Sequence, residues 1–450
     1  MQHNDQLYLY STEKIGKAIV LLAIPSVLSS LINLIYNLIN SIFVGMLKNT
    51  AMIAAITVST PLTTVIHAFG SALGVGASSF LSRQLGANEL ENSKETVKTA
   101  ITSGILVSIL IIILSTFCLR PLLSLLTDDP AVLEYAYVYS AIIFYSSIAI
   151  NLKQIIINLL KTEADILFPM FVLLGSVLIN IIFAPFFMFD WGLNLGISGA
   201  ALATMLADLV SLVALLWRLC CKTKYVRWRF GSFGFKLSAF KEIINVGSAV
   251  FVRNALPSFS TAIFASSAGM FGTAFVAGVG IGKKASSLAL FAIQGMASGF
   301  LPFAAYNYGA QNKQRLRKSS LMLISGMTIF AIVMTIVFQF YTEPICSLYA
   351  SDPQVILYGS QMLRFFNISL VTQGAYNVLL VMLQAFGRNK DSMMVSLARG
   401  VFFYIPIVYF LPRLYGSLGI YLSQPITDWL TLFVILYISR HIIKHLLFDK

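Results

Sequence analysis

Charged side chains are scarce in this chain of 450 residues, because Asp, Glu, Lys and Arg together make up only 11% of it. A soluble globular domain carries about 25%. Charges this sparse cannot cover a surface that faces water, whereas 58% of the residues are hydrophobic and long apolar runs recur along the chain. A run of about 20 apolar residues can cross a bilayer as a helix. The composition therefore excludes a soluble globular protein and predicts an integral membrane protein.

Cysteine is also rare, with four residues, and none of them follows C-x-x-C or another zinc-ligand spacing. This pattern predicts neither a disulfide framework nor a metal site. The sequence lacks H-E-x-x-H, a pair of catalytic carboxylates and a nucleophile with a neighbouring base. We therefore expect a protein that is not an enzyme and has no catalytic residue and no cofactor.

Twelve apolar runs, separated by polar breaks, predict an all-α fold of twelve transmembrane helices. The first run follows a polar stretch and is too long for the h-region of a signal peptide, so we expect an uncleaved first span. The runs lie near residues 17–44, 52–82, 96–117, 133–158, 166–189, 196–217, 240–268, 272–306, 319–342, 356–385, 392–412 and 417–439.

The basic residues predict the orientation of these spans. With the N-terminus inside, most of the 31 Lys and Arg residues fall in inner segments, and only Lys48, Arg120 and Arg413 fall in outer loops. Inner loops are enriched in Lys and Arg, so both termini are predicted to be cytoplasmic in a multi-pass protein of the cell (inner) membrane. The same rule explains the basic stretch KTKYVRWRF (222–230) as a topology anchor. We expect the lipid bilayer as a partner, and no nucleic acid.

The chain also matches itself at an offset of 223 residues, the separation of Asp129-Pro130 from Asp352-Pro353. At the same offset Gly76 falls on Gly299. These matches occupy equivalent places in the topology, which indicates an internal repeat.

The repeat predicts the domain organisation. Residues 1–220 are expected to form an N-terminal six-helix half, residues 221–239 a basic cytoplasmic linker, and residues 240–450 a C-terminal six-helix half. Because six is even, both halves start on the same side of the membrane, so the two repeats are parallel around a central cavity. Such a cavity is a natural site for cargo.

Several segments resemble the multidrug and toxic compound extrusion (MATE) family. They are Tyr36–Gly45 (YNLINSIFVG), Gly199–Thr204, Tyr306–Asn312, and Arg399 with Pro406. The resemblance covers essentially the whole chain and implies a cation-coupled antiporter, driven by H⁺ or Na⁺, that exports small amphipathic compounds. We expect a monomer with a small-molecule substrate.

The sequence departs from the family pattern at two positions. Many members carry Asp where this chain has Asn40, and an acid where it has Ala184, one turn after Asn180. An Asn side chain can coordinate a cation or cargo through its amide oxygen, but it cannot carry a proton. The coupling ion therefore stays open between H⁺ and Na⁺.

Asp208 is a candidate for the missing titratable group, because it lies one helical turn after Thr204 and on the same face. A charge in mid-membrane costs at least about 2.5–3.5 kcal/mol and so needs a reason. The alternative is that Asp208 and Asp428 are ion-paired between helices. The predicted cation or cargo site of the first half contains Tyr36, Asn37, Asn40, Asn180, Thr204 and Asp208.

The spans of the second half carry more cations than acids. A second-half cavity is predicted from Arg253, Lys283, Arg399 and Asp428. Asp428 can neutralise only one of the cations, so the others either line the cavity or extend toward the membrane surface. This cationic character keeps a second function open, a flippase for a lipid-linked or anionic substrate.

Three further features are assigned structural roles. Gly278–Lys284 lacks the spacing of a phosphate loop, so its glycines are expected to permit close helix approach. His67 has no second ligand near it in the sequence and is expected to pack in the core. Prolines within the spans, Pro25 above all, predict bends.

Overall fold

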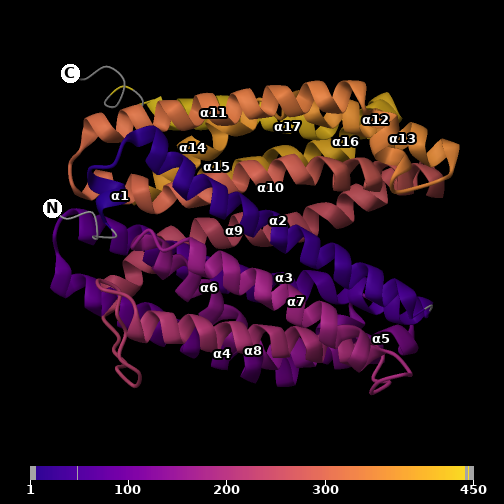
Figure 1. The fold of residues 1–450 in the computed structure, drawn as a ribbon. Helices are drawn as coiled ribbons and strands as arrows, with labels where there is room; N and C mark the ends of the chain where they lie inside the picture. Colours follow the sequence, from indigo (N-terminus) through magenta and orange to yellow (C-terminus); the bar gives the residue numbers. More distant parts are fainter. Residues whose placement is uncertain (1–6, 48, 441–443, 445–450) are drawn as a thin grey trace. The chain divides into compact units, whose positions relative to one another are not determined.

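The computed structural model describes residues 7–47, 49–440 and 444, and every regular element in these ranges is helical (Figure 1). Nine uninterrupted helical segments are long and apolar enough to span a membrane, and two further spans are bent pairs of helices. With the 33-residue helix α9, these make the twelve spans that the sequence predicts. The prediction of an all-α membrane fold is confirmed.

The helices divide into two compact units. Unit 1 holds residues 1–12 and 31–255, and unit 2 holds residues 13–30 and 256–450. The described helices of unit 1 are α1 (Tyr8–Ser11), the second part of α2 (Ile15–Met46), α3 (Thr50–Gly86), α4 (Leu90–Ser124), α5 (Pro130–Tyr145), α6 (Ser147–Thr162), α7 (Leu167–Met188), α8 (Ile197–Cys221) and the first part of α9 (Leu237–Gly269).

Unit 2 begins with the first part of α2 and continues from the second part of α9. Its other helices are α10 (Thr273–Gly309), α11 (Lys313–Phe340), α12 (Thr342–Ser347), α13 (Pro353–Phe366), η1 (Asn367–Ser369), α14 (Thr372–Ala385), α15 (Asn389–Leu397), η2 (Ala398–Tyr404), α16 (Ile405–Tyr415) and α17 (Ser417–Ile438). The compact units thus differ from the predicted halves, because each takes the first part of the other half's first helix. The predicted boundaries at 220 and 240 stay a prediction.

Glycines explain why these helix segments pack where they do. In unit 1, a Cβ atom on Gly76 of α3 would lie 2.2 Å from the carbonyl oxygen of Ile243 in α9. In unit 2, a Cβ on Gly299 of α10 would lie 2.7 Å from the carbonyl oxygen of Leu22 in α2. Small residues let helix backbones approach this closely. Gly76 therefore allows the first part of α9 to pack in unit 1, and the repeat-related Gly299 allows the first part of α2 to pack in unit 2. We call these two helix parts the exchanged segments.

The glycines of α10 that precede Lys283 also act as predicted. A Cβ on Gly278 would lie 2.7 Å from the carbonyl oxygen of Val355 in α13, and one on Gly282 would lie 2.8 Å from that of Gly359. These two glycines bring α10 and α13 together, which confirms the packing role. Gly280, on another side of α10, would meet no atom within 4 Å.

We expect Gly76→Val and Gly299→Val each to destabilise the protein by about 1–3 kcal/mol, because the new side chain overlaps a backbone carbonyl. Thermal unfolding of the purified variants measures the effect. Gly175→Val in α7 is the matched control, since a Cβ there meets no atom within 4 Å. Equal loss of stability in all three variants would contradict this account of the packing.

The Asp-Pro repeats start equivalent helices in the two units. The Asp129 carboxylate accepts a hydrogen bond from the N–H of Ala131 (2.8 Å) at the start of α5. The Asp352 carboxylate accepts one from the N–H of Gln354 (2.8 Å) at the start of α13. Asp is a favoured N-cap, and Pro fits the first helical position, where no N–H is needed. The repeated dipeptide is thus a helix-start signal.

These two helices open the two bent spans. The bend is 48° between α5 and α6, and 51° between α13–η1 and α14. The break falls at Ser146 in unit 1 and at Leu370–Val371 in unit 2. Ser369, which ends η1 just before the second break, lies 223 residues after Ser146. Neither bend contains proline, whereas α2 continues as a helix through Pro25. The sharpest breaks among the described spans are therefore not at the prolines that the sequence singled out.

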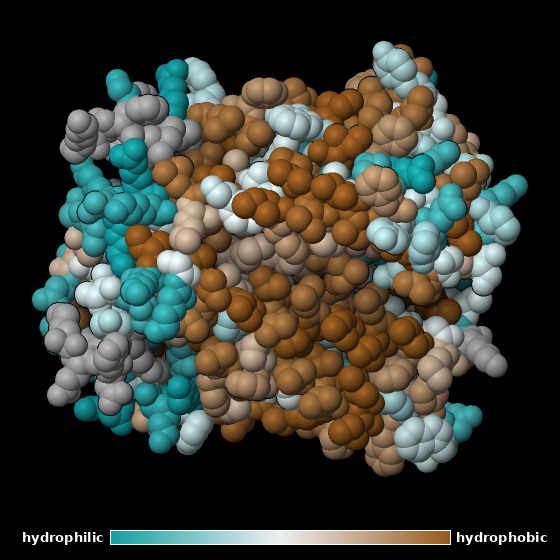
Figure 2. All heavy atoms as spheres, turned by 45° about the horizontal axis from the view of Figure 1, so that its top comes forward, coloured by the Kyte–Doolittle hydropathy of each residue, from teal (hydrophilic) through white to brown (hydrophobic). Residues whose placement is uncertain are grey.

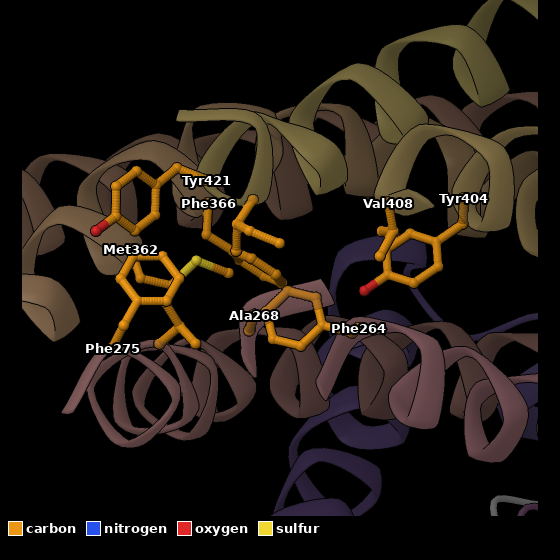
Figure 3. Packing of buried hydrophobic residues seen from close by; sticks show 10 residues of the cluster. Phe264, Ala268, Phe275, Met362, Phe366, Tyr404, Val408 and Tyr421 are labelled. Atoms are coloured by element: carbon orange, nitrogen blue, oxygen red, sulfur yellow. The ribbon is translucent and has the colours of Figure 1, made fainter. Parts of the chain in front are cut away.

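The apolar side chains of the helices serve two surroundings. In unit 2, buried Phe264, Phe275, Met362 and Tyr421 belong to one hydrophobic cluster (Figure 3). Many other large apolar side chains are exposed, such as Phe117 (75%). Figure 2 shows hydrophobic side chains gathered along the middle of the helices and hydrophilic ones towards their ends. This is the pattern expected of helices that face lipid.

The predicted linker is held against unit 1 by Glu163, which follows α6. Its buried carboxylate accepts the backbone N–H groups of Lys224 (3.1 Å), Tyr225 and Val226 (2.5 Å). Farther along, the N–H of Lys236 donates to the hydroxyl of Thr99 (3.1 Å). Burial raises the pKa of Glu163, and the three backbone hydrogen bonds oppose that rise. The linker is therefore an ordered part of this unit.

The raised pKa predicts a pH-dependent stability. A carboxyl whose folded pKa is raised stabilises the fold fully below its ordinary value of 4.5, and this contribution is lost as the pH rises through the folded pKa. The melting temperature of the wild type minus that of Glu163→Gln should therefore fall as the pH rises from 4.5 to 8. Glu89→Gln, at an exposed position, should show no such trend. A constant difference for Glu163→Gln would contradict the assignment.

Candidate functional site

Polar side chains from three helices of unit 1 meet at Tyr36. Its hydroxyl donates to the Thr204 hydroxyl of α8 (3.0 Å). The amide nitrogen of Asn180 in α7 lies 3.4 Å from both of these oxygens. Asn40, one turn after Tyr36 on α2, lies within hydrogen-bonding reach of the Tyr36 hydroxyl. The structure thus brings together four of the six residues predicted for the first-half site, and we call them the Tyr36 cluster.

Asn180 has an unused acceptor in this cluster. The side chain is fully buried, and its carbonyl oxygen Oδ1 has no hydrogen-bond partner among the described residues. A buried polar atom without a partner costs about 1–3 kcal/mol and calls for an explanation. Three neutral oxygens, those of Asn180, Tyr36 and Thr204, lie in this cluster. Such a donor set suits a hard cation or a polar group of a cargo molecule.

Of the two departures from the family pattern, Asn40 belongs to the Tyr36 cluster, whereas Ala184 does not. Ala184, one turn after Asn180, is buried in an apolar cluster with Val44, Met188 and Ala203. The position at which many family members carry an acid is therefore surrounded by apolar side chains in this protein. Asn37 does not join the Tyr36 cluster, because it is exposed and its amide donates to the carbonyl of Asn33 in its own helix (2.9 Å).

Asp208, the proposed proton carrier, is ion-paired with Lys153 of α6. The two side chains are 5% and 10% exposed. Charges taken out of water in this way need a partner, and each supplies the other's. The structure therefore favours the alternative that the sequence left open, an ion pair between helices. Lys153 was not among the predicted site residues, although a second rare charge in the same half was a signal for it.

His67 of α3 is not the core residue that the sequence suggested. The side chain is exposed, and it lies close enough to Asp208 and Lys153 to interact with both charges. A lone histidine gives no sequence signal for this position, because its partners lie on α6 and α8. The ion pair of unit 1 therefore has a titratable neighbour that reaches open space.

Because the pair is buried, removing one partner leaves the other charge without a partner and lowers the free energy of unfolding, and removing the second partner should then add little. We expect Lys153→Met and Asp208→Asn each to destabilise the protein by about 3–5 kcal/mol, and the double variant by less than their sum. Thermal unfolding of the four proteins gives the coupling. The exposed pair Arg120 and Glu134 is the control, with a coupling of about 0–1 kcal/mol. Additive effects at Lys153 and Asp208 would contradict the ion pair.

In unit 2 the carboxylate of Asp428, on α17, has three partners. The guanidinium of Arg399 donates to it at 2.8 Å, the hydroxyl of Ser369 at 2.8 Å and the amide of Gln424 at 2.9 Å. The side chain of Asp428 is only 4% exposed. Two of these partners, Ser369 and Gln424, were missed by the sequence analysis, because a serine or glutamine in a span gives no sign that a carboxylate from another helix lies near it.

Arg399 owes its position to a π-helix, η2, which runs over seven residues from Ala398 to Tyr404. Pro406 follows η2 after one intervening residue, and a proline has no N–H and crowds the carbonyl four residues before it. A π-helical turn is a known response to such strain and occurs often at functional sites. The guanidinium also lies over the ring of Tyr376, 4.8 Å from its centroid.

The remaining predicted residues of the second half separate. Lys283 of α10 belongs to unit 2, and its ammonium lies 3.8 Å from the centroid of the Phe264 ring. Arg253 belongs to unit 1, because the division of α9 falls after Ala255. The structure therefore pairs Arg399 with Asp428 in unit 2, and the place of Arg253 in the predicted second-half cavity stays a prediction.

Comparison with known proteins agrees with this fold. The family model MatE matches residues 25–186 and, a second time, residues 249–410. The matches begin 224 residues apart (249 minus 25), close to the offset found within the sequence. Two copies of one helical repeat in a twelve-span fold define a multi-pass membrane transporter of small molecules. The chain belongs to the MATE family.

Curated relatives and solved structures cover nearly the whole chain. The multidrug export protein MepA of Staphylococcus haemolyticus is 27% identical over 99% of this chain and 98% of its own length. A transporter from Pyrococcus furiosus has a TM-score of 0.90 at 22% identity over 99% of both chains. A mutant of the transporter VcmN from Vibrio cholerae has a TM-score of 0.87 at 22% identity, over 96% of this chain and 97% of its own.

Proposed function

We propose that this transporter is a cation-coupled antiporter, driven by H⁺ or Na⁺, that exports small amphipathic organic compounds by alternating access. The observation that carries the proposal is the Tyr36 cluster, with the unpartnered buried oxygen of Asn180. Its support from relatives is the multidrug export function named for the staphylococcal MepA proteins.

The cluster offers a place where a cation and a cargo molecule compete. The oxygens of Asn180, Tyr36 and Thr204 are neutral, so they favour a bound ion such as Na⁺ over a proton. Lys153 of α6 pairs with Asp208 of α8, and Asp208 lies four residues after Thr204 on α8. Protonation of Asp208 would break this pair, so it offers the route by which H⁺ acts.

The direction of export rests on the orientation of the chain. We propose that both termini are cytoplasmic, because most Lys and Arg residues then lie on the inner side. The protein is proposed to work in the cell membrane as a monomer. The alternative function is a flippase for a lipid-linked or anionic substrate, which the excess of cations in the spans of the second half supports.

A reconstituted system tests the coupling. In proteoliposomes with the dye rhodamine 6G as cargo, an imposed Na⁺ or pH gradient should drive dye movement by the wild type. Asn180→Leu removes the unpartnered oxygen and should reduce Na⁺-driven transport by at least about tenfold, about 1.4 kcal/mol. Asp208→Asn protein that thermal unfolding shows to be folded should lose pH-driven transport and keep Na⁺-driven transport.

The control is Asn37→Leu, which changes an exposed asparagine on the helix of Tyr36 whose amide bonds only within that helix. Its transport should match the wild type. Dye movement that needs no ion gradient, or that survives Asn180→Leu and Asp208→Asn under both gradients, would contradict coupling at this site. Movement of a lipid-linked substrate without the dye would favour the flippase.

A further inference from the structure

Lys283 is a cation inside unit 2 whose near neighbours carry no negative charge. Its side chain is half-buried in α10, with the ammonium 3.8 Å from the centroid of the Phe264 ring and 3.5 Å from the hydroxyl of Tyr404. Figure 3 shows Phe264 and Tyr404 on neighbouring helices, with the Tyr404 hydroxyl turned towards the side on which Phe264 lies. Both aromatic side chains are themselves buried.

The acids of unit 2 are engaged elsewhere. Within the described residues, no carboxylate lies within the 4.0 Å of an ion pair with Lys283. Asp428 is the described acid of this unit that lies deep within a span, and it already binds Arg399, Ser369 and Gln424. The other described acids of the unit lie at helix starts: Glu13, Glu343, Asp352 and Asp391. Arg399 and Asp428 pair with each other, so the ammonium of Lys283 has no counter-charge among the described residues.

The ammonium of Lys283 therefore has neutral neighbours but, among the described residues, no anionic partner, which a charge taken out of water needs. The aromatic ring supplies part of the stabilisation, about 0.5–2 kcal/mol for a cation–π contact. An anion would supply the rest and would meet two aromatic side chains beside the cation. One turn before Lys283 the side of α10 is open, because a Cβ on Gly280 would meet no atom within 4 Å.

We propose that Lys283, with Phe264 and Tyr404, forms a binding site in unit 2 for the anionic group of an aromatic organic anion. The proposal deepens the proposed export function, on which it rests, by adding anionic or zwitterionic aromatic compounds to the cargo. The ammonium pairs with the carboxylate, sulfonate or equivalent anionic group, and the rings of Phe264 and Tyr404 pack against the aromatic part. This site is separate from the Tyr36 cluster of unit 1.

Two ions of equal size and opposite charge test the site. Tetraphenylborate and tetraphenylphosphonium share their shape, so a difference between them reports the charge of the site. Their binding is measured on the full chain in nanodiscs of zwitterionic lipid, which adds no anionic competitor. Lys283→Met should weaken tetraphenylborate binding by at least about tenfold, because the counter-charge is lost. Binding of tetraphenylphosphonium should stay the same or become tighter.

Neighbouring variants serve as controls. Lys284→Met removes an equal charge from the next residue, which is exposed, and should leave binding of both ions unchanged. Lys283→Arg keeps the charge and should retain tetraphenylborate binding within about threefold. Thermal unfolding identifies any variant that has lost its fold, and Lys283→Arg then carries the comparison through its selectivity between the two ions.

The proposal is overturned if a folded Lys283→Met binds tetraphenylborate like the wild type, or if Lys284→Met loses as much. It is also overturned if folded Lys283→Arg loses the preference for tetraphenylborate. Failure of the export function is a separate result. In that case no cargo moves under either ion gradient, while binding of tetraphenylborate still depends on Lys283.

Discussion

A charged side chain inside a membrane protein must be neutralised, and the interior of this protein is organised around that constraint. The two acids that lie deep within the described spans each meet a cation from another helical segment, Asp208 with Lys153 and Asp428 with Arg399. Lys153 of α6 and Asp208 of α8 are 55 residues apart, whereas Arg399 of η2 and Asp428 of α17 belong to consecutive spans. The pairs therefore hold α6 against α8 and η2 against α17, and α8 also carries Thr204 of the Tyr36 cluster.

The acids of these two pairs also connect α8 and α17 to the bent spans. In unit 1 the partner of Asp208 is Lys153, seven residues after the bend at Ser146. In unit 2 the carboxylate of Asp428 also accepts a hydrogen bond from Ser369, the last residue of η1 before the bend. A change in the protonation of either acid would therefore alter a contact to a bent span.

The sequence predicted those features that local chemistry decides. The Asp-Pro dipeptides at 129 and 352 became helix starts, because capping depends on residues next to each other. Gly278 and Gly282 became a close helix contact, because only glycine permits it. The all-α fold and the repeat followed from composition and from the offset.

Features that depend on distant residues were not predictable in this way. Lys153 and Asp208 are 55 residues apart, and the residues around each of them do not indicate that the two side chains will meet. The exposure of His67 likewise depends on how three helices pack. The breaks near Ser146 and Ser369 lack the proline that marks a bend in a sequence. The cluster of Tyr36, Asn180 and Thr204 was reached only through helix faces and family resemblance.

The exchanged helix segments have a consequence for how the protein is made. Residues 13–30 are synthesised first but belong to unit 2, and residues 237–255 complete unit 1 only after the linker has been translated. The close contact between Gly76 and α9 therefore cannot form until α9 has been synthesised. Residues 13–30 likewise cannot contact Gly299 until α10 has been synthesised. Neither unit can fold completely from one half of the chain alone. An ancestral gene that encoded one repeat would have needed two copies of its product to build either unit, with the first helices traded between them.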